Sequence, residues 1–199
     1  CLEEESYLNS NYPMPIAETA SIFCETIIKN AALKEASKEE AFTILESSIS
    51  DSGQVIVDIY SRFLFESALF EKRKEGSISV HELKELMLKA QKDAYGDGLD
   101  HNVLHPYMWV CKPHYYSADY NFYNFPYAFG LLFAKGLYAE YINRGNDFVK
   151  EYDRLLSITG KNKIPDITKI MGIDIHSIDF WRNSLKVIEG EIEEFIKLK

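Results

Sequence analysis

The chain has 199 residues, of which 46% are hydrophobic and 27% charged, a balance that excludes disordered and collagen-like proteins. Its formal net charge of -9 repels polyanions and no basic stripe offsets that repulsion, so nucleic acid is not an expected partner. No apolar run approaches the roughly 20 residues that cross a bilayer, and the first residues lack the apolar core of a signal peptide. The three cysteines, at positions 1, 24 and 111, are odd in number and have no metal-type spacing. We therefore expect a reduced, cytoplasmic protein without a membrane partner.

Helical periodicity dominates the first half of the chain. Apolar residues recur at spacings of three and four over residues 15–35, 38–50 and 53–75, which predicts three amphipathic helices. The tripeptide at 51–53, Asp-Ser-Gly, is either a break between the last two helices or a soft spot in one long helix, and the sequence leaves both open. After Gly76, a Ser79–Glu82 capping box predicts a further helix that runs to about residue 94.

The second half begins with a different kind of segment. Residues 95–122 contain two glycines, two prolines and three of the five histidines, which predicts a long loop with a short extended piece at 108–111. Helices are then expected over about 123–144, from 146 or 147, after Pro165, and over about 177–197. The predicted fold class is all-α, with residues 1–199 as one helical unit and one long His- and Tyr-rich loop. Function is expected in that loop.

Three histidine patterns carry little weight as metal sites. His81 and Glu82 begin like the H-E-x-x-H zinc helix, but Glu85 stands where the second histidine belongs. His101 and His105 have helical metal spacing, yet glycines and a proline around them disfavour a helix. His176 directly precedes the last helix and is interpreted as a local structural residue.

Two glutamates form a stronger pattern near the start of the first helix. Glu18 and Glu25 lie seven residues apart, so both carboxylates share one helix face. They are either two solvated acids, or a metal ligand with a second acid that supports it from behind.

A segment rich in tyrosine follows Pro113. Five tyrosines and His114 fall within fourteen residues, the span from His114 to Tyr127. Such a cluster is either a packed aromatic surface whose phenol groups reach water, or a set of hydrogen-bond donors aimed at a developing oxyanion. The composition leaves both interpretations open.

Four stretches of the sequence are informative together: MPIAETASIFCETI, IYSRFLFESALFEKR, HPYMWVCKPHYYSADYNFYNFPYAFGLLFAKGLYAEY and DFWRNSLKVIEGEIEEFI. In this order they resemble the oligoendopeptidase F family of thimet-oligopeptidase-like zinc metallopeptidases. The resemblance extends from about Tyr12 to the C-terminus, and it implies a largely helical enzyme with a deep channel for short peptides. By the same resemblance Glu18 is the third zinc ligand and Glu25 an acid that supports the metal site. His114 with Tyr120 or Tyr123 is implied to stabilise the tetrahedral intermediate.

The family's H-E-x-x-H helix, which should lie before Glu18, is absent. The resemblance therefore implies the C-terminal fragment of a catalytic domain whose parent is a cytoplasmic zinc endopeptidase acting on short peptides. The fragment alone is expected to be inactive, to retain no zinc, and to be able to dimerise through the face that truncation exposes. The alternative is a self-contained helical module that binds peptides or partner proteins.

Overall fold

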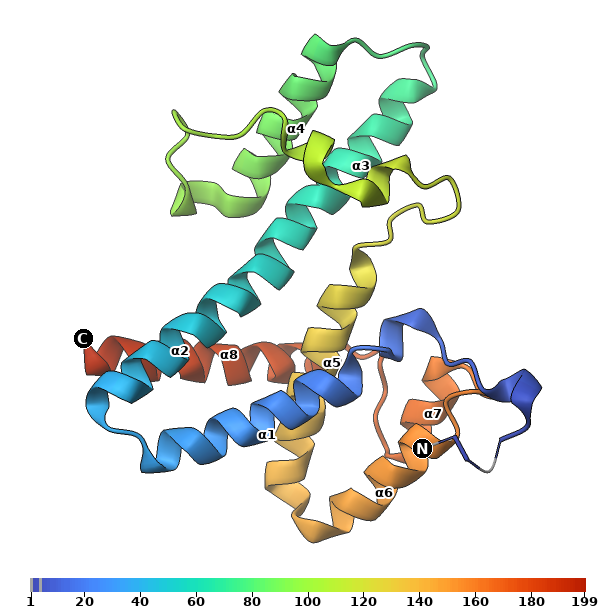
Figure 1. The fold of residues 1–199 in the computed structure, drawn as a ribbon, viewed down its shortest axis with the longest axis vertical. Coiled ribbons are helices and arrows are strands. Elements are labelled where there is room, and N and C mark those ends of the chain that lie inside the picture. The colour runs from blue at the N-terminus through green and yellow to red at the C-terminus, as the bar shows by residue number, and fades with distance from the viewer. Residues whose placement is uncertain (1, 4) are drawn as a thin grey trace. The chain divides into compact units, whose positions relative to one another are not determined.

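Every helix that the periodicity predicts is present in the computed structural model, which describes residues 2, 3 and 5–199 (Figure 1). No strand occurs in this described part, so the all-α prediction is confirmed. None of the described helices is both long and apolar enough to span a bilayer. The chain forms two compact units, one from residues up to Ser52 together with Phe129–Lys199, the other from Gly53–Ala128. That the two units make one domain stays a prediction.

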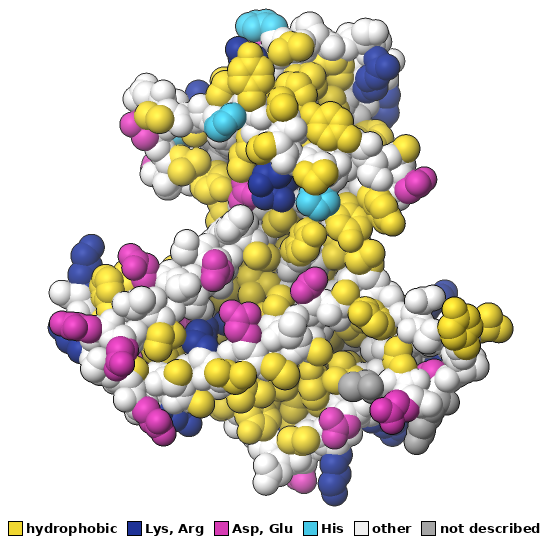
Figure 2. All heavy atoms as spheres, in the orientation of Figure 1, with side chains coloured by type: hydrophobic (Ala, Val, Ile, Leu, Met, Phe, Trp, Pro, Cys, Tyr) yellow, Lys and Arg dark blue, Asp and Glu magenta, His cyan; other side chains and the backbone are white. Residues whose placement is uncertain are grey.

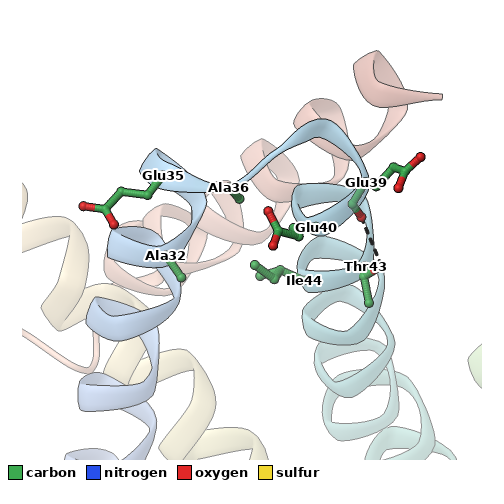
Figure 3. A pocket seen from close by; sticks show the side chains of 7 residues that line it. All are labelled: Ala32, Glu35, Ala36, Glu39, Glu40, Thr43 and Ile44. Carbon is green, nitrogen blue, oxygen red and sulfur yellow. Dashed lines mark hydrogen bonds between the residues drawn. The ribbon is translucent and has the colours of Figure 1, made fainter.

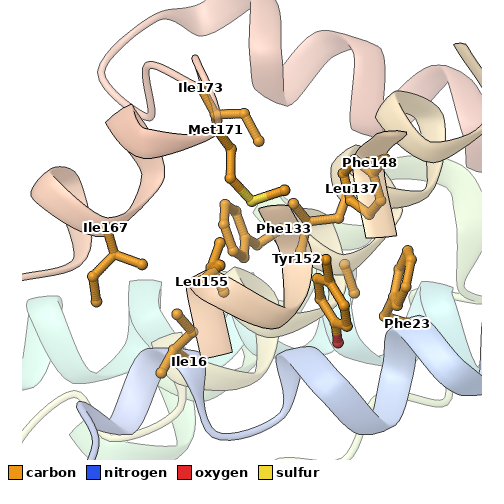
Figure 4. Packing of buried hydrophobic residues seen from close by; sticks show 11 residues of the cluster. Ile16, Phe23, Phe133, Leu137, Phe148, Tyr152, Leu155, Ile167, Met171 and Ile173 are labelled. Carbon is orange, nitrogen blue, oxygen red and sulfur yellow. The ribbon is translucent and has the colours of Figure 1, made fainter. Parts of the chain in front are cut away.

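The first unit is a bundle around an aromatic core. Its helices are α1 (Thr19–Glu35), α2 (Lys38–Gly53), most of α5 (Phe125–Arg144), α6 (Asn146–Ser157), α7 (Ile164–Ile170) and α8 (Ile178–Leu198). Phe23 of α1 packs on the rings of Phe148 and Tyr152 of α6, and Phe133 of α5 is fully buried among them (Figure 4). Burying this apolar surface fixes α1 against α5 and α6.

A buried charge network joins four helices of the same unit. Glu191 of α8 accepts hydrogen bonds from Lys29 of α1 (2.6 Å), Lys135 of α5 (2.8 Å) and Ser48 of α2 (2.8 Å). Burial, and then the neighbouring charge of Lys135, lower the pKa of Lys29 to about 8. The pKa of Glu191 is lowered because the two ammonium groups outweigh its burial. One carboxylate thus satisfies donors from three other helices.

The second unit is built on two helices that pack against each other, α3 (Ile59–Arg73) and α4 (Val80–Tyr95). Phe65, Met87 and Ala90 are buried between them. The Ser79–Glu82 capping box is confirmed: the Ser79 backbone N–H donates to the Glu82 carboxylate, and the Ser79 hydroxyl accepts from the Glu82 N–H. Before α3 the backbone stays helical through Gly53 and a π-helical segment, Gln54–Asp58. The Asp-Ser-Gly tripeptide is therefore a soft spot, not a break.

The predicted loop after α4 is confirmed, but the extended piece within it is wrong. Met108–Cys111 is a short 3₁₀ helix, as are Gly96–Gly98 and Pro113–Tyr116. The Trp109 indole N–H donates to the carbonyl of Pro106 at 3.1 Å, and Met108 and Trp109 pack on the buried cluster of α3 and α4. This packing closes a tight turn where the apolar run alone suggested a strand.

Candidate functional site

The His- and Tyr-rich segment forms one cluster of rings in the second unit. Tyr123 stacks on the His114 imidazole, with ring centroids 5.3 Å apart and planes inclined by 21°. The Tyr127 hydroxyl lies 3.5 Å from His114 Nε2, and Tyr120 contacts Tyr123 edge-on at 5.0 Å. The structure thus brings His114 directly against Tyr123 and Tyr127, whereas Tyr120 lies against Tyr123.

The surroundings favour the neutral form of His114. Burial, then the positive charges of Arg62 and Lys112, lower the pKa of the imidazole below its ordinary value. Its Nδ1 is buried without a hydrogen-bond partner among the described residues. At neutral pH the ring is therefore an uncharged imidazole whose two nitrogens differ in role.

Tyr127 is the member of this cluster that the sequence did not single out. It lies in the first turn of α5, four residues after Tyr123, and it is half-buried beside His114. The available signal was that spacing: residues four apart at the start of a helix lie on one face. Figure 2 shows histidine and hydrophobic side chains side by side on the visible face of this unit.

Glu18 lies in the first unit, at the residue that precedes α1. Its backbone is helical and its carbonyl accepts from the Ile22 N–H at 3.1 Å, but its exposed side chain does not cap the helix. Glu25, two turns later, is also exposed on α1. The side chains of both glutamates are thus exposed.

The turn that contains Glu18 packs tightly on α5 at Gly130. A Cβ atom added at Gly130 would lie 2.8 Å from the Glu18 Cβ, closer than real Cβ contacts allow. Only glycine lets the two backbones approach this closely.

Gly130→Ala is therefore expected to lower the free energy of unfolding by about 1–2 kcal/mol, because overpacking outweighs the better helix propensity of alanine. Gly190→Ala on α8 is the matched control, since nothing lies within 4 Å of its added Cβ; it should raise stability by up to about 1 kcal/mol. Urea denaturation measures both. Equal effects of the two substitutions would refute the close contact.

The remaining histidines do not assemble a metal site. His101 Nε2 lies 2.9 Å from the carbonyl of Gly96, His105 Nδ1 accepts from the Tyr107 N–H, and His81 pairs with Glu85 on an exposed face. Over residues 2, 3 and 5–199, no three His, Cys, Asp or Glu side chains gather as a metal-binding group. Cys24 and Cys111 are free thiols, and Cys1 lies outside the described residues.

An acidic hollow lies between α1 and α2. It measures about 580 Å³, and its lining includes three glutamates (Figure 3). The lining residues are Ala32, Glu35, Ala36, Glu39, Glu40, Thr43 and Ile44. Ser37 donates two hydrogen bonds to Glu40 from its backbone and hydroxyl, which lower the pKa of that carboxyl. Glu40 is thus engaged in capping α2.

Comparison with known proteins identifies close relatives over the whole chain. The chromosomal oligoendopeptidase F of Lactococcus lactis subsp. cremoris is 31% identical over 202 residues, and the group B oligopeptidase PepB of Streptococcus agalactiae is 29% identical over 199. Each alignment covers 98% of this chain but 32% of the relative, so the chain spans about a third of the length of the curated relatives it matches.

Two crystal structures share the fold. One from Chlamydophila abortus superposes with a TM-score of 0.86 at 26% identity, over 98% of this chain and 32% of that one. Oligoendopeptidase-F from Enterococcus faecium gives 0.80 at 20% identity, over 96% and 36%. The family model of peptidase family M3 matches residues 2–187. The chain therefore belongs to peptidase family M3.

Proposed function

We propose that the chain is part of a zinc-dependent oligoendopeptidase that hydrolyses short peptides. The observation that carries the proposal is the ring cluster of His114, Tyr123 and Tyr127, which presents an imidazole and phenol groups at one place. The names of the relatives, oligoendopeptidase F and PepB, support the substrate class. Membership of a peptidase family favours this function over a helical interaction module.

Glu18 is the residue of this chain proposed to hold the metal, with Glu25 supporting the metal site. An exposed carboxylate is a suitable oxygen ligand for zinc, but a catalytic zinc needs three protein ligands. The other two would come from an H-E-x-x-H helix outside this sequence. Zinc held by these ligands would supply Lewis-acid chemistry, polarising the scissile carbonyl and lowering the pKa of bound water.

The aromatic cluster would act on the oxygen of the scissile carbonyl. As the scissile carbonyl becomes tetrahedral, its oxygen gains negative charge, and hydroxyl or imidazole N–H groups aimed at it stabilise the transition state. His114 is suited to this because its lowered pKa leaves it neutral and able to donate from one nitrogen. Of the two tyrosines that the sequence left open, Tyr123 is preferred, since its ring contacts His114 and that of Tyr120 contacts Tyr123.

The chain by itself is then expected to be inactive and to retain no zinc, because Glu18 alone supplies a single ligand. For the complete protein we propose the cytoplasm as the location and short peptides as substrates. Dimerisation of the isolated chain, through the face that truncation exposes, is a further expectation.

Tyr123→Phe tests the proposal in the protein expressed from its complete reading frame. We expect kcat for a short peptide to fall about 10²–10³-fold with little change in KM, since the lost hydroxyl acts mainly in the transition state. Tyr116→Phe is the matched control, because Tyr116 is 62% exposed and outside the ring cluster. A Tyr123→Phe enzyme as fast as the control would refute the role of Tyr123.

A further inference from the structure

We propose that Arg62 and Glu66 of α3 are positioning residues that fix Tyr123 against His114 by binding the residues on either side of it. The inference rests on the proposed function, which makes Tyr123 the hydrogen-bond donor to the oxyanion. Asp58, Arg62 and Glu66 follow one another at spacings of four, so they form one row on one helix face. We call these three residues the α3 polar row.

Glu66 binds the backbone on the N-terminal side of Tyr123. Its Oε1 accepts a hydrogen bond from the Phe122 N–H at 2.8 Å, and its side chain is 4% exposed. Phe122 has φ 56°, the one positive value of a non-glycine residue in the described part of the chain. A bulky residue is disfavoured in this conformation, so surrounding contacts must maintain it.

The Phe122 ring is bound by the same helix. It packs on Phe70 with centroids 5.4 Å apart and on Phe63 at 5.7 Å, both from α3. The ring contacts and the Glu66 hydrogen bond together impose the unusual backbone angle that turns the chain just before Tyr123.

Arg62 binds the C-terminal side. Its Nη1 donates to Asn124 Oδ1 at 3.0 Å, and its Nη2 pairs with Asp58, whose other oxygen accepts from the Tyr95 hydroxyl at 3.3 Å. Arg62 is 7% and Asn124 3% exposed. Phe122 and Asn124 are the two chain neighbours of Tyr123, so the row determines where its ring lies.

Two buried donors in and beside the α3 polar row have no hydrogen-bond partner among the described residues. They are Arg62 Nε and Asn124 Nδ2, although buried donors are normally satisfied. Apolar residues would avoid this cost if the row served only to stabilise α3. The Arg62 charge, like that of Lys112, additionally lowers the pKa of His114, whose Nε2 lies 3.5 Å from the Tyr127 hydroxyl. Arg62 therefore contributes both to the position of Tyr123 and to the neutral state of His114.

Nuclear magnetic resonance of the 199-residue chain tests the inference without any assay of activity. Glu66→Met should speed hydrogen exchange of the Phe122 amide roughly tenfold or more. The stacked Tyr123 ring displaces the chemical shifts of the His114 ring protons, an effect we call the stacking shift. Glu66→Met should reduce this stacking shift. Glu66→Gln keeps an acceptor oxygen, so the exchange rate of the Phe122 amide and the His114 chemical shifts should stay close to those of the unsubstituted chain. A folded Glu66→Met chain with unchanged His114 shifts would overturn the role of Glu66.

Arg62→Met and Lys112→Met separate position from charge. Each removes a positive charge near His114 and should raise the pKa of its imidazole. Arg62→Met should also abolish the stacking shift, whereas Lys112→Met should keep it. Arg62→Lys, which keeps the charge but not the two-pronged geometry, replaces Arg62→Met if circular dichroism shows that the latter is unfolded.

If the folded arginine variant keeps the stacking shift, the inference is overturned while the proposed peptidase function still stands. Conversely, an unaltered kcat in Tyr123→Phe would remove the proposed role of Tyr123 but leave these structural signals as expected.

Discussion

Glu191→Gln is expected to lower the free energy of unfolding by about 3–5 kcal/mol, the range for removing one partner of a buried ion pair. The Glu191 carboxylate lies 2.6 Å from the Lys29 ammonium and 2.8 Å from that of Lys135, and Lys135 is 3% exposed. The glutamine amide has nearly the same shape but no charge. Two ammonium groups would then stay buried without a counter-charge, at the junction of α1, α2, α5 and α8.

Glu193→Gln is the matched control, because Glu193 is exposed on the same helix; it should change stability by less than about 0.5 kcal/mol. Replacing Lys29, Lys135 and Glu191 together by methionine should recover most of the loss, since apolar residues need no counter-charge. Urea denaturation of the unsubstituted chain and the three variants gives the values. A Glu191→Gln chain as stable as the control would show that the network contributes little.

In the protein expressed from its complete reading frame, Glu18→Gln is expected to weaken zinc binding by more than about 100-fold. Peptide hydrolysis should fall in parallel. Under the proposed function Glu18 donates directly to the metal, and a neutral amide is a much poorer zinc ligand than a carboxylate. Because Glu18 is exposed and caps nothing, the substitution should leave the fold intact.

Glu25→Gln provides the comparison on the same helix. A residue that only supports a ligand typically contributes about 10–100-fold to metal affinity, so its effect should be the smaller of the two. Zinc titration of both variants, with circular dichroism to verify folding, gives the order. A larger loss in Glu25→Gln would mean that the two roles are assigned the wrong way round.

Much of the fold was predictable because helices leave a local signal. The three-and-four spacing of apolar residues indicated the helix that contains Phe23, and the Ser79–Glu82 pair marked the start of α4 to the residue. The short turn at Met108–Cys111 was not predictable in this way. Its conformation depends on the packing of Met108 and Trp109 against α3 and α4, whose residues are distant in the sequence.

Some residues of the candidate site could likewise be predicted from local sequence, and others could not. His114 and Tyr123 stand in one conspicuous stretch of sequence, so composition pointed to them. Arg62 and Glu66 precede that stretch by about fifty residues, and nothing in the order of residues reveals that Glu66 accepts from the Phe122 N–H. Such long-range polar contacts appear only when tertiary packing is known.

Hydrolysis of a short peptide by the complete protein, before and after removal of zinc, tests the central claim most directly. We predict cleavage of an internal peptide bond, its loss on treatment with a chelator, and its recovery when stoichiometric zinc is added. Cleavage that survives complete removal of the metal, or a zinc-loaded folded protein that cleaves no short peptide, would contradict a zinc-dependent oligoendopeptidase.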